Sequence, residues 1–106
     1  MSGLSTHILD TGRGEPASGV VVRVESRGVV LGRGVTDADG RIADFGLGML
    51  QAGVYRLVFE TEAYFGGAAA AFFPEVVVSF RADGQRSRYH VPLLLSPYSY
   101  STYRGS

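Results

Sequence analysis

The chain has 106 residues, with ten basic and ten acidic side chains and no cysteine. One domain, residues 1–106, is expected at this length. The balanced charge excludes a general attraction to nucleic acid or anionic membranes, and the lack of cysteine excludes disulfides and thiolate metal sites.

Glycines, prolines and short runs rich in valine, tyrosine and leucine predict an all-β chain divided by turns. A loop dense in turn formers, residues 10–19, follows the first strand. Gly40 gives the turn 37–41 access to positive φ. Segment 27–36 is interpreted as a strand that glycines interrupt. In the first half, strands are expected at residues 4–9, 20–26, 27–36 and 42–45.

The second half is predicted to contain one short helix between strands. The alanine-rich segment 61–73 breaks the alternation, and it favours a helix kept short by two glycines and Pro74. Pro92 cannot donate to a strand ladder, so it should lie at an edge or a bulge. Strands at this spacing predict a sandwich of two sheets. In this half they are expected at residues 53–60, 75–82, 88–95 and 100–104.

No membrane partner is expected. The longest apolar run, residues 66–73, is far shorter than the ~20 residues that span a bilayer. Residues 1–10 contain neither a basic start nor an apolar signal core. A cytoplasmic location is therefore the expectation.

The two histidines, His7 and His90, are both predicted to lie opposite an apolar strand face. Side chains alternate along a strand, so His7 shares its face with Ser5, and His90 shares its face with Arg88. Two solvated surface histidines are the simpler interpretation. If their strands are neighbours in one sheet, the two imidazoles share a patch instead.

Such a patch has a definable chemistry. An imidazole titrates near pH ~6.5, so two of them can divide acid and base roles at neutral pH. A guanidinium nearby can hold a carbonyl oxygen that gains negative charge. These groups suit attack of water on a polarised carbonyl. Two histidines fall short of the three ligands usual for zinc, so no metal and no cofactor are expected.

Several stretches together resemble one family. They recur in family order over nearly the whole chain and read LSTHILDTGRGEPA, TDADGR, GVYRLVFET, FFPEVVVSF and YHVPLLLSPYSYSTYRGS. The chain resembles the transthyretin-related 5-hydroxyisourate hydrolases and, more distantly, transthyretin. The final YRGS is the most specific of these motifs, because transthyretins share LLSPYSYST but lack this ending.

The resemblance implies a fold, an assembly and a reaction. The fold would be an all-β, transthyretin-like sandwich of two four-stranded sheets with one short helix. Four copies would assemble as a homotetramer, with active sites in channels between dimers. The reaction would be hydrolysis of 5-hydroxyisourate, a small molecule, to 2-oxo-4-hydroxy-4-carboxy-5-ureidoimidazoline in urate breakdown.

The resemblance also implies the site residues. His7, Arg41 and His90 would be catalytic; which histidine is the base is left open. On sequence alone Arg41 would be an exposed turn residue. Arg88 departs from the family, where many relatives have a histidine. The substrate would contact His7, Arg41, Tyr103, Arg104 and Ser106.

A second interpretation belongs to a different class of protein. A non-catalytic carrier of the transthyretin type would bind an apolar ligand in the same channel without chemistry. Such a carrier would replace the histidines and the arginine with groups that do not titrate, and it would lack the tail. The presence of all these residues favours the hydrolase.

Overall fold

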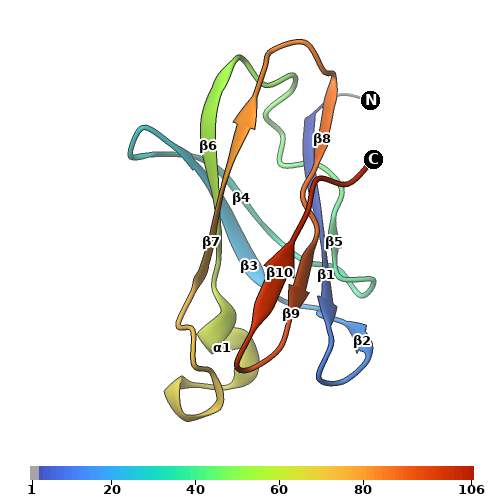
Figure 1. The fold of residues 1–106 in the computed structure, drawn as a ribbon, viewed down its shortest axis with the longest axis vertical. Helices are drawn as coiled ribbons and strands as arrows, with labels where there is room; N and C mark the ends of the chain where they lie inside the picture. Colours follow the sequence, from blue (N-terminus) through green and yellow to red (C-terminus); the bar gives the residue numbers. More distant parts are fainter. Residues whose placement is uncertain (1–2) are drawn as a thin grey trace.

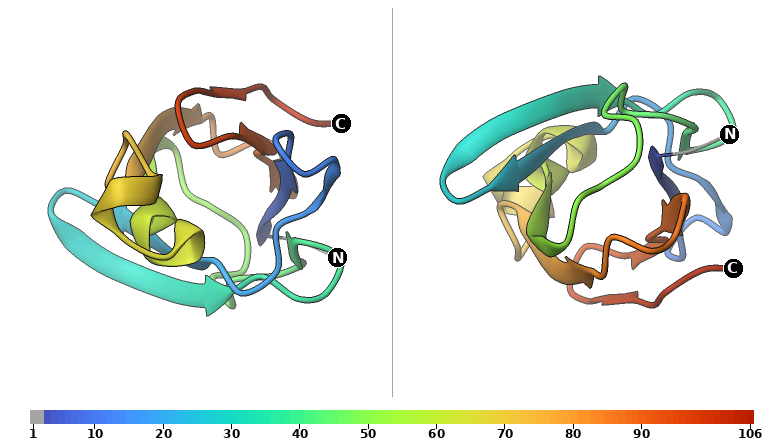
Figure 2. Two further views of the ribbon diagram at one scale, coloured as in Figure 1. Left: turned by 90° about the horizontal axis from the view of Figure 1, so that it is seen from below. Right: turned by 90° about the horizontal axis from the view of Figure 1, so that it is seen from above.

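The computed structural model describes residues 3–106, which form two β-sheets packed face to face (Figure 1). Viewed end-on, β3 in light blue and β4 in cyan lie on one side of the interior, and β1 and β9 lie on the other (Figure 2). None of the helices in this range has the length and apolar character to cross a bilayer. The elements are β1 (Gly3–Asp10), β2 (Glu15–Pro16), β3 (Val21–Ser26), β4 (Val29–Val35), β5 (Arg41–Ile42), β6 (Gly53–Phe59), α1 (Thr61–Phe65), η1 (Ala68–Ala70), β7 (Val76–Ala82), β8 (Arg88–His90), β9 (Leu93–Leu95) and β10 (Tyr100–Thr102).

The first sheet is an antiparallel ladder in the order β4-β3-β6-β7, with one register shift between β3 and β4 at Val24/Glu25. β6 and β7 pair along their whole length, from Gly53 opposite Ala82 to Phe59 opposite Val76. Every second side chain points inward, which follows from the period-two pattern of the sequence. The predicted strands of this sheet are confirmed. Its fully buried inward side chains include Val22, Val24, Leu57 and Phe59.

The second sheet is built around β1 from short pieces. The order is β10-β9-β1-β2, and β5 and β8 also pair with β1. β8 and β9 pair in parallel with successive parts of β1 on one side, and β2 and β5 pair antiparallel on the other. The sandwich is therefore confirmed. This sheet has six short strands rather than the predicted four, because β8 and β9 share one side of β1, and β2 and β5 share the other. Pro92 divides the strand expected at residues 88–95, because it has no N–H to donate.

The core lies between the two sheets. The inner face of the second sheet contributes Leu4, Ile8, Leu93 and Leu95, none of them more than 1% exposed. These residues belong to the faces that alternation predicts to be apolar, so His7 and His90 lie on the opposite face, and both are partly exposed.

Four local details differ from the sequence-based expectations. The strand expected at residues 42–45 is the two-residue β5, and no strand covers residues 43–45. The segment 27–36 is not interrupted, because β4 runs through its glycines; a Cβ at Gly34 would lie 3.1 Å from Ile42 Cγ2. β2 lies within the expected loop 10–19. β10 ends at Thr102 rather than at residue 104. The helix is confirmed and ends after one turn at Gly66, whose φ of 94° is left-handed.

Candidate active site

A tight turn places Arg41 beside His7. The two residues are directly opposite each other in the antiparallel pairing of β5 with β1. Asp37 shapes the turn, because its Oδ1 accepts hydrogen bonds from the backbone N–H of Asp39 at 2.9 Å and of Arg41 at 3.0 Å. Gly40 lets the turn approach β1 closely, since a Cβ there would lie 2.5 Å from the carbonyl oxygen of Ile8.

The parallel pairing of β8 with β1 brings His90 opposite Ser5. The Ser5 Oγ lies 2.8 Å from His90 Nδ1. Two further bonds hold this junction: Val91 N–H donates to the Ser5 carbonyl at 3.0 Å, and Thr6 Oγ1 donates to the Val91 carbonyl at 2.7 Å. The imidazole therefore has a fixed position, although 85 residues separate it from its partner in sequence.

The C-terminal segment folds back onto His90. Gly105 forms an antiparallel bridge with His90, and its N–H donates to the His90 carbonyl at 2.8 Å. A Cβ on Gly105 would lie 2.5 Å from His90 Cδ2, so only glycine fits against the ring. Before this bridge, Thr102 Oγ1 donates to the Pro92 carbonyl at 2.7 Å.

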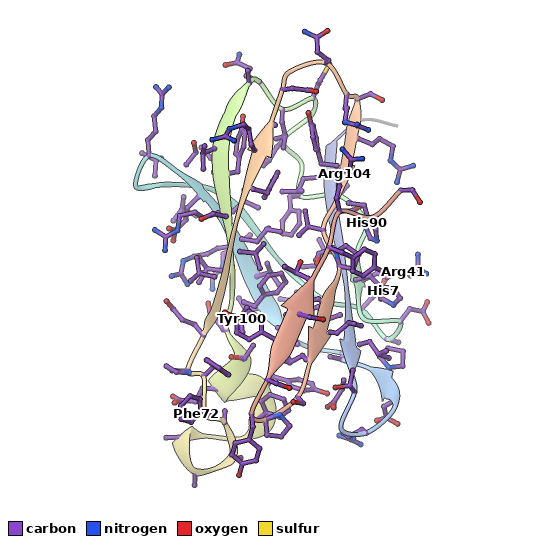
Figure 3. The ribbon with its side chains drawn as sticks, in the orientation of Figure 1. His7, Arg41, Phe72, His90, Tyr100 and Arg104 are labelled. Carbon is purple, nitrogen blue, oxygen red and sulfur yellow. The ribbon has the colours of Figure 1, made fainter. Side chains whose placement is uncertain are left out.

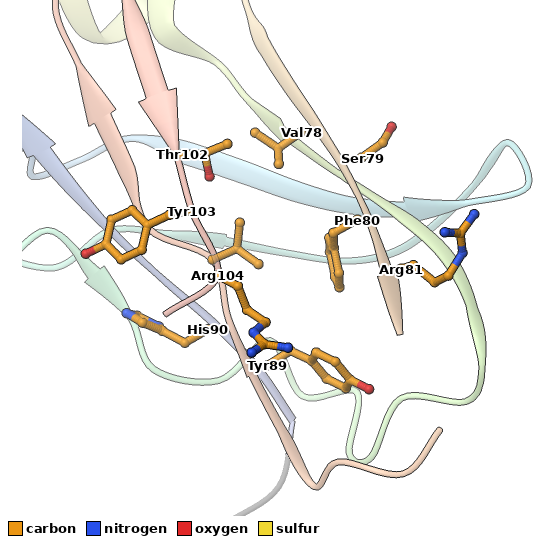
Figure 4. Close-up of a pocket in the computed structure, with 10 residues that line it drawn as sticks. Val78, Ser79, Phe80, Arg81, Tyr89, His90, Thr102, Tyr103 and Arg104 are labelled. Carbon is orange, nitrogen blue, oxygen red and sulfur yellow. The ribbon is translucent and has the colours of Figure 1, made fainter. Parts of the chain in front are cut away.

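Two cavities open beside His90. The larger, of about 460 Å³, has no acidic side chain in its lining, which is Ser5, Thr6, Arg41, Ala43, Arg86, Arg88, His90, Gly105 and Ser106. The smaller, of about 320 Å³, lies between β7 and the C-terminal segment (Figure 4). Tyr103 and Arg104 line this second cavity together with Phe80 and His90.

The electrostatic surroundings favour a neutral His90. Burial lowers the pKa of His90 below its ordinary value, and the nearby positive groups of His7, Arg41 and Arg88 lower the pKa further. The lowered pKa favours the unprotonated ring, which can accept a proton. Within residues 3–106, Arg41, Arg86 and Arg88 form no ion pair, so their charge faces the cavity or solvent.

The structure brings His7, Arg41 and His90 together in space (Figure 3). Ser106 lines the same cavity as Arg41 and His90, whereas Tyr103 and Arg104 line the second one. His7 is not among the lining residues of either cavity in a single chain.

Sequence reasoning did not select Ser5 or Arg86 as site residues. Ser5 had a usable signal, because it shares the outward face of the first strand with His7. Arg88 was noted as a neighbour of His90 on one strand face and as a departure from the family, but it was not selected. It lines the larger cavity and lowers the pKa of His90. Arg86 had no such signal, since it lies in the turn before β8. In the described part of the chain, no three histidine or acidic side chains converge as metal ligands.

Comparison with known proteins gives the same family over the whole length. The profile of the family described as "Transthyretin: HIUase/Transthyretin family" matches residues 4–105. The 5-hydroxyisourate hydrolase of Salmonella typhimurium is 47% identical, and the match covers 97% of this chain and 80% of that protein.

Solved structures agree with the sequence matches. The 5-hydroxyisourate hydrolase of Klebsiella pneumoniae is 45% identical, with a TM-score of 0.89 over 100% of this chain and 94% of that one. Transthyretin from Sparus aurata is 34% identical, with a TM-score of 0.84 over 99% of this chain and 97% of that one. The transthyretin-like sandwich is thereby confirmed, and the chain belongs to the HIUase/transthyretin family.

Proposed function

We propose that this protein hydrolyses 5-hydroxyisourate to 2-oxo-4-hydroxy-4-carboxy-5-ureidoimidazoline in urate breakdown. The observation that carries the proposal is the meeting of His7, Arg41 and His90 on the outer face of the second sheet. Relatives named 5-hydroxyisourate hydrolase, matching along almost the whole chain, support the same reaction.

The reaction needs a base, an acid and a group that stabilises negative charge. Water adds to a ring carbonyl carbon, the carbon–nitrogen bond breaks, and the ring nitrogen leaves with a proton. His90 acts as the base, because its lowered pKa favours the neutral ring, which can take a proton from water. Arg41 donates N–H groups to the carbonyl oxygen as it becomes negative. His7, opposite Arg41, supplies the proton to the leaving nitrogen.

The C-terminal residues complete the site in this proposal. Tyr103, Arg104 and Ser106 contact the substrate, and Tyr103 does so from a neighbouring copy in a homotetramer. Its side chain is 57% exposed, as is expected of a residue that an assembly covers. Burial between subunits would also dry the site and strengthen its electrostatics. In this proposal the protein acts in the cytoplasm. Sedimentation should show a tetramer, and a fully active monomer would contradict the proposed assembly.

Transthyretin-type carriage of a ligand is the second candidate. The likeness to Sparus aurata transthyretin supports it, since the fold is shared over almost the whole chain. The larger cavity argues against an apolar ligand, because three arginines and a histidine line it. A carrier would bind its ligand without consuming it, so the activity assay distinguishes the two candidates.

The test follows the absorbance of freshly generated 5-hydroxyisourate with and without the protein. His7→Ala, Arg41→Ala and His90→Ala should each lower the rate by about 10²-fold or more and keep the circular dichroism spectrum of the parent. Arg56→Ala, an exposed arginine of β6 on the other sheet, is the matched control and should keep full activity. Normal turnover in the three site variants would overturn the assignment.

A further inference from the structure

We infer that Ser5 is the positioning residue of His90: its hydroxyl holds Nδ1 and leaves Nε2 as the ring atom that exchanges protons with the substrate. The inference rests on the proposed function, in which His90 is the base. Ser5 lies in the LSTHIL stretch that carries the resemblance, but neither the site residues that the resemblance implies nor the proposed mechanism includes it.

The hydrogen bond is built into the backbone of the sheet. Ser5 and His90 are direct neighbours in the parallel pairing of β1 and β8. The pairing is closed at both ends, by Gly3 N–H donating to the Ser87 carbonyl at 2.7 Å and by Val91 N–H donating to the Ser5 carbonyl at 3.0 Å. Ser5 is only 7% exposed, so water competes little for its 2.8 Å contact with Nδ1.

Gly105 limits the ring on its other edge. The position of a Cβ on Gly105 would be 2.5 Å from His90 Cδ2 and 3.2 Å from Cγ, so the glycine lies directly against that edge. Turning the ring over would exchange Nδ1 and Cδ2 and would lose the bond to Ser5. The ring is thus held from two sides, by one polar contact and one steric contact.

The remaining ring nitrogen, Nε2, is free for chemistry. It has no hydrogen-bond partner within residues 3–106. No buried side-chain nitrogen or oxygen in that range lacks a partner, so Nε2 is open to solvent rather than enclosed. His90 lines both cavities, so a small substrate can reach its ring.

A hydroxyl suits this task better than a carboxylate. Serine can donate to a bare Nδ1 or accept from an Nδ1–H, so the contact persists in either neutral tautomer and in the imidazolium. A carboxylate would stabilise the charged ring and raise its pKa. Ser5 therefore fixes the orientation of His90 without cancelling the lowering of its pKa that burial and the neighbouring cations produce.

The test combines kinetics with NMR of the His90 ring in the assembled protein. Ser5→Ala should lower kcat about 10-fold with little change in KM, which is the size expected for one hydrogen bond. The Ser5 hydroxyl can accept a hydrogen bond from Nδ1–H of the charged ring, so its loss should lower the pKa of His90 and move the acid limb of kcat/KM to lower pH. Ser5→Thr keeps the hydroxyl and should restore both. If Ser5→Ala does not fold, Ser5→Cys gives a weaker bond at similar size.

Thr6→Val is the matched structural control. It removes a buried hydrogen bond to the adjacent Val91 carbonyl in the same junction, and it should lower stability without moving the pKa of His90. An unchanged kcat and an unchanged His90 pKa in Ser5→Ala, beside an inactive His90→Ala, would overturn the inference and leave the proposed function standing. Full activity in His90→Ala would instead contradict both the proposed function and this inference, because each requires His90 as the general base.

Discussion

The two sheets of the sandwich differ in the continuity of their strands. In the β4-β3-β6-β7 sheet, β6 and β7 pair over seven successive residues. In the other sheet, β1 has partners of only two or three residues each, β2, β5, β8 and β9. Every residue proposed for the site lies in the fragmented sheet or in the tail that follows it.

The difference in strand continuity has a physical cause and a consequence for the site. A continuous ladder satisfies its backbone groups by itself, and its outward side chains pair with one another, as Arg23 does with Glu25 at 2.6 Å. Each break in the fragmented sheet brings a new part of the chain against β1. Arg41 arrives from one turn and His90 from another, so separate breaks supply separate groups to one place.

The largest effect is expected in the core of the continuous sheet. Phe59→Ala should lower the free energy of unfolding by about 3–5 kcal/mol, because it removes a fully buried ring and leaves a cavity. Urea denaturation measures the change. Phe72→Ala, which removes a ring that is 69% exposed, is the control and should change little. A similar loss of unfolding free energy in both variants would contradict the placement of Phe59 in the core and of Phe72 at the surface.

In the fragmented sheet, Gly105→Ala should separate activity from stability. A Cβ at this position would push against His90 Cδ2 and displace the ring or the tail, so kcat should fall by about 10²-fold. The free energy of unfolding should change far less than in Phe59→Ala. Gly12→Ala, whose nearest contact would be 3.4 Å away, is the control. Equal activity of the two alanine variants would contradict the close approach of the tail.

Tyr64 connects α1 to the end of β1, and its contact should appear in the alkaline stability. Its hydroxyl donates to the buried Asp10 carboxylate at 2.7 Å. Burial first, and then the bond to Asp10, raises the pKa of Tyr64 to about 12. The stabilisation is complete below pH 10.0, the ordinary value, and is lost as the pH rises through about 12.

Tyr64→Phe should therefore cost about 1–2 kcal/mol at neutral pH and flatten the decline above pH 10.0. Thermal unfolding at a series of pH values measures both effects. Tyr98→Phe changes a tyrosine that is 75% exposed and should keep the parent profile. A parallel decline in Tyr64→Phe and the parent would contradict the prediction.

The smallest effect is expected at the rim of the larger cavity. Arg88 lowers the pKa of His90 through its positive charge, after burial, His7 and Arg41. Arg88→Ser should raise that pKa, so the acid limb of kcat/KM should move to higher pH. Salt screens an exposed charge, so the shift should shrink at high ionic strength. Arg56→Ser is the control, and a shift of the limb to lower pH in Arg88→Ser would be the opposite of the expected sign.

The continuous sheet could be predicted from sequence because its pattern is local. Val20, Val22 and Val24 recur at every second position, and all three are fully buried. β2, in contrast, carries no local pattern: Glu15 and Pro16 form a strand only because β1 lies beside them. The uninterrupted β4 was missed for a related reason, since Gly34 is required by the approach of a distant residue, Ile42.

The candidate site was predictable only in part. Alternation placed His7 and His90 on outward faces, which the structure confirms. That the two strands share a sheet depends on long-range pairing, and the resemblance, not the residues alone, indicated it. Ser5 was on the predicted outward face, but a small hydroxyl gives no sign of its partner until the pairing of β1 with β8 is known.

The parallel pairing of β1 with β8 and β9 also sets the order of events during folding. The hydroxyl of Ser5 and the imidazole of His90 are 85 residues apart, and the entropic cost of closing so long a loop comes before any gain from the contact. During synthesis, β1 has no partner on this side until β8 and β9 have emerged, because Ser5 precedes His90 by 85 residues. Enzymatic turnover should accordingly appear only after β8 and β9 have paired with β1.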